Sequence, residues 1–129
     1  MAEPWAAPLR AGFGAMVRHG LAGVWVRGRL PTGPTVWAGN HHSWWDPFVA
    51  GALLRRAGRR AGLLMRQDNL ERHPYLRGLG VFGTDEARHG VDLLRAGRVV
   101  VVYPEGELRP AGPPGPLAPG AAWYAQRAP

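Results

Sequence analysis

The stretch Val99-Val100-Val101-Val102-Tyr103 decides the fold class of this 129-residue chain. Four β-branched residues in succession are typical of a strand that is buried on both faces, as strands of parallel sheets are. Residues 86–96 show helical spacing, and Gly97 ends that helix just before the strand begins. The sequence therefore predicts an α/β fold with a mostly parallel central sheet that is flanked by helices.

The rest of the chain also alternates between the apolar patterns of strands and those of helices. Apolar patterning and turn residues predict further strands over residues 24–30, 35–39, 63–66 and 81–84. Further helices are expected in the first half of 47–60, over 69–77 and for a turn or two within 120–127. Pro-Gly punctuation predicts a turn at 31–34 and a loop over 110–119.

The first 22 residues form a segment of their own. Apolar residues recur there at helical spacing, which gathers them on one helix face: Trp5, Leu9, Phe13, Met16, Val17 and Leu21. Such a stripe can lie in a membrane interface or pack on the domain's own sheet, and the pattern favours neither. No apolar run reaches the ~18 residues of a spanning helix, and we expect no signal peptide. The predicted organisation is an amphipathic helical segment over 1–22 and an α/β domain over 23–129.

Composition limits the classes of partner. The net charge is +7 and all 16 basic side chains are arginine, which is typical of a GC-rich bacterial genome when Ala, Gly, Pro and Leu are also frequent. This charge favours phosphate-bearing substrates, acidic carrier proteins, anionic lipids or nucleic acid. Because cysteine is absent, disulfides, thiolate catalysis and Cys-based zinc sites are excluded. Nucleic-acid binding has the least support, since no recognised binding module is visible.

A histidine and a carboxylate follow the expected strand at 35–39. Histidine can remove a hydroxyl proton during acyl transfer, so His41 is a candidate general base. Asp46 would then fix the tautomer of the ring and stabilise the imidazolium. Structural alternatives remain: Asp46 can cap a helix that begins at Pro47, or form a capping box with Ser43. Metal binding by His41, His42 and Asp46 is weaker, because adjacent histidines tend to point apart.

A second group follows the strand at 99–103, at the edge where open α/β sheets bind ligands. It reads Tyr103-Pro104-Glu105-Gly106. Glu105 is expected to hydrogen-bond hydroxyls of an acceptor, and Gly106 lets the backbone approach a ligand closely. Arg109 is expected to lie within reach of a phosphate. Taken alone, a Pro-Glu-Gly sequence is usually only a turn.

The two groups together resemble a known family. Asn40-His41-His42-Ser43-Trp44-Trp45-Asp46 followed by the Pro-Glu-Gly turn is similar to the 1-acylglycerol-3-phosphate acyltransferases, which are glycerolipid acyltransferases. The Val-Arg-Gly at 26–28 and the Pro-Gly-Ala-Ala at 119–122 extend the resemblance over about residues 24–127. It implies His41 as general base, Asp46 as its partner, and acceptor binding by Glu105 and Gly106.

The resemblance also implies the reaction and its setting. A fatty acyl group would move from acyl-CoA or acyl carrier protein to a lysophospholipid-type hydroxyl, in phospholipid biosynthesis. Neither a metal nor a cofactor is expected, and nucleic acid is not an expected partner. The protein would be cytoplasmic and peripheral on the inner face of the cell membrane.

Three features depart from the family pattern. Asp85 and Glu86 follow the segment 80–83, where the family usually places a phosphate-binding arginine, and Arg88 is the nearest one. Glu107-Leu108-Arg109 stands in place of Thr-Arg-Ser. Because carboxylates repel phosphate, a different alcohol or an amine is an open alternative for the acceptor. The chain also ends before a later strand and a fourth motif, which predicts a truncated sheet with an unpaired edge. The alternative function is a non-catalytic lipid- or acyl-carrier-binding remnant of the family.

Overall fold

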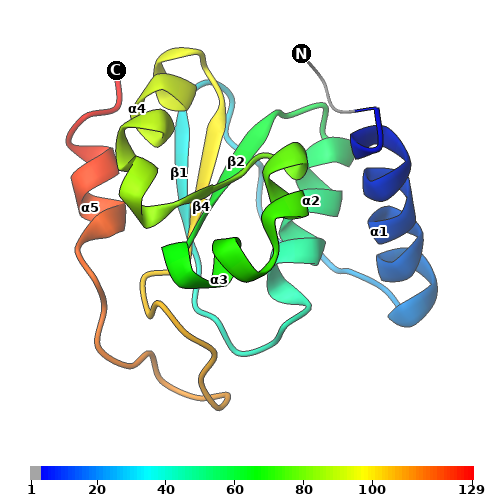
Figure 1. Cartoon of the computed structure of the whole chain (residues 1–129). Helices are drawn as coiled ribbons and strands as arrows, with labels where there is room; N and C mark the ends of the chain where they lie inside the picture. The colour runs from blue at the N-terminus through cyan, green and yellow to red at the C-terminus, as the bar shows by residue number, and fades with distance from the viewer. Residues whose placement is uncertain (1–3) are drawn as a thin grey trace.

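The structure is a computed structural model that describes residues 4–129, and its centre is a four-stranded sheet (Figure 1). The strands are β1 (Thr35–Ala38), β2 (Ala61–Met65), β3 (Val81–Gly83) and β4 (Val99–Val102). Their order across the sheet is β1-β4-β2-β3, and each neighbouring pair is parallel. This confirms the predicted α/β class with a parallel sheet.

Helices cover both faces of the sheet (Figure 1). They are α1 (Ala6–Gly20), α2 (Asp46–Arg56), α3 (Gln67–Arg72), α4 (Ala87–Arg95) and α5 (Gly120–Ala125), with two 3-10 helices, η1 (Pro74–Leu79) and η2 (Thr84–Glu86). Helix α2 packs on one face, with α1 outside it, while α4 and α5 pack on the other. The strand β4 therefore lies between two helical layers.

Strand β4 confirms the prediction made from its four valines. Val99 and Val101 pack with Ala50 and Leu54 of α2 on one face of the sheet. The other two valines of the strand belong to the core on the opposite face. No valine of β4 is more than 4% exposed. Burial of a valine side chain contributes roughly 1.5–3 kcal/mol, so β4 anchors both layers.

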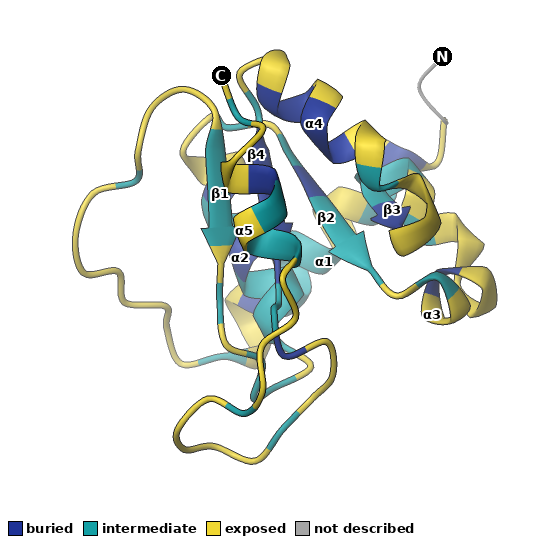
Figure 2. Cartoon of the chain, turned by 90° about the vertical axis from the view of Figure 1, so that its left-hand side faces the viewer, coloured by how far each residue is buried: buried dark blue, intermediate teal, exposed yellow. Residues whose placement is uncertain are grey.

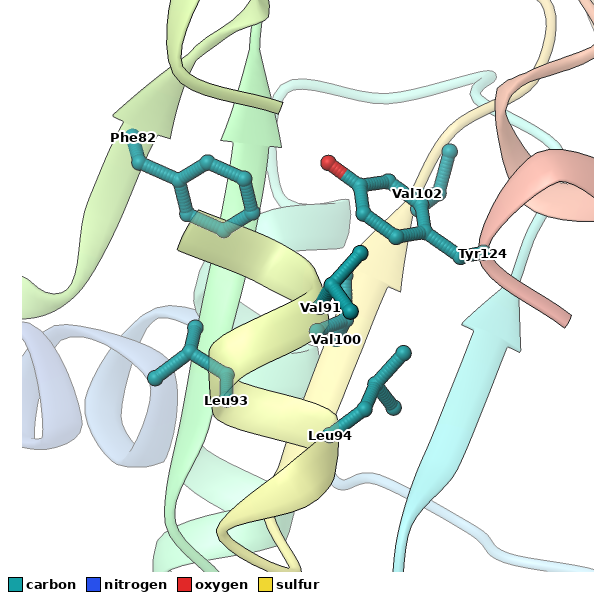
Figure 3. Packing of buried hydrophobic residues seen from close by; sticks show 7 residues of the cluster. All are labelled: Phe82, Val91, Leu93, Leu94, Val100, Val102 and Tyr124. Atoms are coloured by element: carbon teal, nitrogen blue, oxygen red, sulfur yellow. The ribbon is translucent and has the colours of Figure 1, made fainter. Parts of the chain in front are cut away.

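The larger core lies between the sheet, α4 and α5, and Figure 3 shows its buried side chains: Phe82, Val91, Leu93, Leu94, Val100, Val102 and Tyr124. Tyr124 joins the two helices, because its hydroxyl donates to the Ala87 carbonyl at 2.8 Å. A Cβ at Gly90 would lie 2.5 Å from the Tyr124 ring, so only glycine permits this close contact. The core thus fixes the C-terminal helix against the sheet.

The predicted N-terminal helix is present as α1, and its apolar stripe faces the protein. The Phe13 ring lies 4.8 Å from the Phe48 ring of α2, and Val17 is 6% exposed. Arg10 donates to the Gly78 carbonyl of η1 at 2.9 Å. The stripe therefore packs on α2 and η1, which lie between it and the sheet. Among residues 4–129, no helix has the length and apolar character needed to cross a membrane.

The strand predicted over residues 24–30 is wrong. The whole segment 21–34 is irregular and mostly exposed, and it runs away from the sheet in Figure 2. Trp25 is 83% exposed, and Gly28 has a φ of +99°, which interrupts an extended run. A strand needs a paired neighbour and a buried face, and this segment has neither within the described residues. Its alternating sequence pattern alone was not sufficient.

The single helix predicted over 69–77 is also wrong, because α3 and η1 are separate. His73, between them, has φ −132° and ψ 58°. Pro74 disfavours a helical conformation at the residue before it and lacks an N–H to continue the helix. The break therefore occurs where the proline requires it.

Candidate active site

The parallel pairing of β1 with β4 brings the two sequence motifs together. Ala38 is aligned with Val102 at the ends of the strands, and the N–H of Gly39 donates to the Val102 carbonyl at 3.1 Å. His41 therefore lies three residues after the end of β1, and Glu105 lies three residues after the end of β4, on adjacent loops. The two loops, 39–45 and 103–119, lie together beyond the carboxyl edge of the sheet (Figure 1).

His41 and Asp46 share a hydrogen bond. Nδ1 of His41 lies 3.0 Å from Oδ2 of Asp46, and the two side chains are 18% and 30% exposed. The same Oδ2 accepts the N–H groups of His42 and Ser43, each at 2.9 Å. Nε2 of His41 makes no hydrogen bond to any residue from 4 to 129, so this nitrogen is open to a ligand.

The hydrogen bonds keep Asp46 ionised. Burial alone would raise the pKa of Asp46, but the hydrogen bonds from the His41 ring and the Ser43 and His42 N–H groups outweigh burial. The pKa of Asp46 therefore lies below its ordinary value of 3.8. A carboxylate that stays charged can fix the tautomer of a histidine and stabilise its protonated form.

The prediction that Asp46 is the N-cap of a helix beginning at Pro47 is wrong. The N-cap of α2 is Trp45, and Asp46 is the first helical residue. Its carboxylate turns back towards the loop and accepts the Ser43 N–H, which is one arm of a capping box. The other arm is absent, since the Ser43 hydroxyl accepts the Trp45 N–H at 3.2 Å. Asp46 therefore organises the loop that carries His41.

Tyr103 supports the ring of His41, a contact that is not predicted from the sequence. The two rings stack with centroids 4.6 Å apart and planes inclined by 25°. Burial, and then the nearby charge of Asp46, raise the pKa of Tyr103, so the phenol stays neutral. No local sequence signal indicates this stack, because it depends on the pairing of Ala38 with Val102, which places the chain before His41 beside Tyr103.

Glu105 lies directly behind His41, and its side chain is fully buried. Its Oε1 accepts the N–H of His41 at 2.9 Å, and its Oε2 accepts the N–H of Gly115 at 3.0 Å. These two hydrogen bonds, together with nearby His42 and Arg109, lower the pKa of Glu105 despite its burial. This inward placement differs from the motif-based expectation, in which the carboxylate faces the acceptor.

Gly106 and Arg109 complete the predicted set. Gly106 has a φ of +74°, a conformation that favours glycine, and its N–H donates to the Tyr103 carbonyl at 2.9 Å. Arg109 reaches the site through its backbone, since its N–H donates to the His41 carbonyl at 2.9 Å. Its guanidinium lies 3.0 Å from Glu107 and 3.9 Å from Glu105. Binding of a phosphate by Arg109 would therefore compete with two carboxylates.

The rings of the adjacent histidines have different partners. Nδ1 of His42 lies 3.3 Å from the Arg109 carbonyl oxygen, and its Nε2 lies 2.7 Å from the amide nitrogen of Asn40. Within residues 4–129, no group of three or more His, Cys, Asp or Glu side chains is arranged to hold a metal ion.

The acidic segment at 85–86 follows β3, at the opposite edge of the sheet from β1. Three strand spacings of ~4.8 Å separate these edges, so the acids are remote from His41. Glu86 is held there by Arg77, at 2.6 Å, and by the Gly83 N–H, at 3.1 Å. These contacts hold the pKa of Glu86 below its ordinary value. Its charge therefore balances an arginine within the domain.

Comparison with known proteins identifies the family of this chain. The family model described as "Acyltransferase" matches residues 23–129, which include both motifs and the whole sheet. Searches of curated proteins and of solved structures gave no match. Because the family model covers most of the chain, the protein belongs to the acyltransferase family, the glycerolipid acyltransferases that include the lysophosphatidic acid acyltransferases.

Proposed function

We propose that this acyltransferase moves a fatty acyl group from acyl-CoA or acyl carrier protein to the hydroxyl of a lysophospholipid or related acceptor. One observation carries the proposal: His41 shares a hydrogen bond with Asp46 at the carboxyl edge of the sheet, beside the Pro-Glu-Gly turn. The family supports acyl transfer in general. The donor, the acceptor and the place in phospholipid biosynthesis belong to the proposal.

The proposed reaction uses His41 as the general base. Nε2 of His41 takes the proton from the acceptor hydroxyl while its oxygen attacks the thioester carbonyl carbon. Asp46, bound to Nδ1, stabilises the imidazolium that forms. The new C–O bond gives a tetrahedral intermediate, whose C–S bond then breaks. The thiolate leaves with the proton that His41 carried, so the products are an ester and a free thiol. Neither a metal nor a cofactor takes part in this scheme.

Exposed apolar side chains beside the site favour a lipid substrate. Trp44, Leu108 and Leu117 are 52%, 53% and 63% exposed, and they lie on the two loops that carry His41 and Glu105. Aromatic and apolar residues in such positions suit the interface between membrane and water. The net charge of +7 suits anionic lipid head groups. We therefore propose that the protein works as a peripheral protein on the cytoplasmic face of the cell membrane.

A second candidate function is binding without catalysis, of a lipid or an acyl carrier protein. The pairing of Arg109 with Glu107 and Glu105 favours it, because a family position expected to bind phosphate is occupied by carboxylates. This alternative predicts that the chain binds vesicles or acyl carrier protein without transferring an acyl group.

The test is a transfer assay with labelled acyl-CoA and labelled acyl carrier protein on a panel of lysolipids. His41→Ala is expected to lower turnover by about 10²–10⁴-fold, which is the usual contribution of general acid–base catalysis. His19→Ala, which removes an exposed histidine from α1, is the matched control and is expected to retain activity. Unchanged turnover in His41→Ala would eliminate the proposed base. Binding without turnover in the wild-type chain would favour the second candidate.

A further inference from the structure

The carboxylate of Glu105 is an ionised group in the interior, and its surroundings explain how it is tolerated. Removing a carboxylate from water is costly unless hydrogen bonds replace the lost hydration. Here each oxygen accepts one backbone N–H, from His41 at 2.9 Å and from Gly115 at 3.0 Å. The Arg109 Nε lies 3.9 Å from Oε2 and supplies the counter-charge. Each oxygen of the Glu105 carboxylate thus has a hydrogen-bond donor within the protein.

The two N–H groups come from segments far apart in the sequence. One belongs to the loop after β1, and the other to the Pro-Gly-rich loop between β4 and α5. Neither His41 nor Gly115 lies in a helix or a strand. The Glu105 carboxylate, itself in the loop 103–119, therefore joins the Gly115 part of that loop to the loop of His41, beside the Arg109 N–H that donates to the His41 carbonyl.

The link acts on the backbone of the proposed base. Glu105 fixes the N–H of His41, the Arg109 N–H fixes its carbonyl, Asp46 fixes its ring nitrogen, and Tyr103 supports the ring face. A histidine ring has only two side-chain torsions, so holding its backbone and one ring nitrogen determines where the opposite nitrogen points. Nε2 is therefore aimed without any contact between Glu105 and the reacting atoms.

We infer that Glu105 is a positioning residue, which ties the His41 backbone to the Gly115 loop and so aligns the His41 ring with Asp46, instead of binding the acceptor. The inference rests on the proposed function of His41 in acyl transfer. It assigns the Glu of the Pro-Glu-Gly turn to the alignment of the base, and it leaves acceptor recognition to other groups.

Glu105→Gln is the main test. A glutamine oxygen can accept one of the two N–H groups, but its NH₂ group then faces the other N–H, donor against donor. Misplacement of a catalytic group by about 1 Å can cost about 10²-fold, so kcat is expected to fall by about 10- to 100-fold. The KM for the acceptor is expected to stay unchanged. Glu71→Gln, the same change at an exposed position of α3, is the control.

The split between kcat and KM decides between the two roles. An increase in acceptor KM with an unchanged kcat would mean that Glu105 binds the acceptor, and it would overturn the inference. Unchanged values of both parameters would overturn it as well. A double-mutant cycle with Asp46→Asn adds a further criterion: if both residues act through His41, their effects on kcat are less than additive. Full additivity would contradict the inference.

A measurement that does not depend on activity separates this inference from the proposed function. In proton NMR spectra, the hydrogen-bonded Nδ1 proton of His41 is expected in the wild-type and Glu71→Gln proteins. It is expected to disappear in Asp46→Asn and in Glu105→Gln. Persistence of this signal in Glu105→Gln would overturn the positioning role, whereas an inactive wild-type protein that retains the signal would refute only the proposed reaction.

Two measurements remain decisive if Glu105→Gln does not fold. Glu105→Asp keeps the charge but is shorter by one methylene, so it cannot reach both N–H groups, and it is expected to show the same fall in kcat. In the wild-type protein, the amide protons of His41 and Gly115 are expected to exchange with deuterium more slowly than exposed amides of the same loops. Exchange of both at the rate of exposed amides would overturn the inference.

Discussion

A single oxygen of Asp46 shapes the loop and holds the base. Oδ2 accepts the N–H groups of His42 and Ser43 and also lies 3.0 Å from the His41 ring. Hydrogen bonds to a charged acceptor contribute about 1.5–3 kcal/mol each at most, so this cluster is a substantial part of the local stability. The structural and catalytic readings of Asp46 are therefore compatible, because the same contacts serve both.

The charge of Asp46 predicts a pH-dependent contribution to stability. Because the folded pKa lies below the ordinary value of 3.8, the stabilisation is present above the unfolded pKa and is lost as pH falls through the folded pKa. Asp46→Asn is expected to lower the free energy of unfolding by about 1–2 kcal/mol near pH 6. The difference between variant and wild type should vanish at pH values below the folded pKa.

Urea unfolding, followed by circular dichroism across the acid range, measures this difference directly. Asp68→Asn is the control, because Asp68 is an exposed acid on α3 that pairs with Arg66 at the surface. A loss of stability in Asp46→Asn that is equal at all pH values would show that the carboxylate charge is not its source.

Residue-level prediction succeeded where the partners are close in sequence. His41 and Asp46 are five positions apart, so a short loop is enough to bring them together, and the structure has their hydrogen bond. The direction of Glu105 was not predictable, because its partners His41 and Gly115 are 64 and 10 residues away. Whether such a carboxylate faces inward depends on how three segments meet, and no local pattern encodes that.

At the scale of elements, the reliable predictions were those in which several signals agreed. Strand β4 has a β-branched run, a preceding glycine stop and a helix before it, and it is buried on both faces. The segment 24–30 had the alternating pattern alone, and it did not become a strand. A strand forms only where it can pair with another strand at the edge of a sheet. The sequence of the segment itself does not show whether such a pairing strand is present.

Helix α4 is expected to be sensitive to loss of packing. Leu94 is fully buried between α4 and the sheet, so Leu94→Ala removes apolar contact and leaves a cavity in the core of Figure 3. Substitutions of this kind cost about 2–5 kcal/mol. Urea denaturation of the purified variant measures the loss, and the slope of the transition reports whether unfolding stays two-state.

Arg95→Ala is the matched control on the same helix. Arg95 is 69% exposed and lies 3.8 Å from the exposed Asp92, an ion pair of small expected value. Its replacement is expected to change the free energy of unfolding by less than about 0.5 kcal/mol. If Leu94→Ala were as mild as Arg95→Ala, the packing of α4 on the sheet would be incorrectly described.

At the scale of the whole molecule, the proposed membrane binding depends on the net charge and on exposed apolar side chains. The stripe on α1, one sequence-based candidate for membrane contact, is used in packing against α2. Trp44, Leu108 and Leu117 instead project from the loops around the proposed base. An acceptor that stays partly in a bilayer could then reach His41 without leaving the lipid, so membrane binding and catalysis would occupy the same side of the protein.

The last prediction concerns this binding. The net charge of +7 is expected to attract the protein to anionic vesicles, because each arginine near such a surface contributes about 1 kcal/mol. Raising the ionic strength from about 0.15 M to about 1 M shortens the Debye length from ~8 Å to ~3 Å, and most of the binding should be lost. Sedimentation with phosphatidylglycerol vesicles, with phosphatidylcholine vesicles as the control, measures the effect. Equal binding to both lipids at both salt concentrations would exclude electrostatic attraction. Complete displacement of the protein from vesicles by DNA fragments would support nucleic-acid binding. Anionic lipid and DNA compete for the same arginines only if one basic surface binds both.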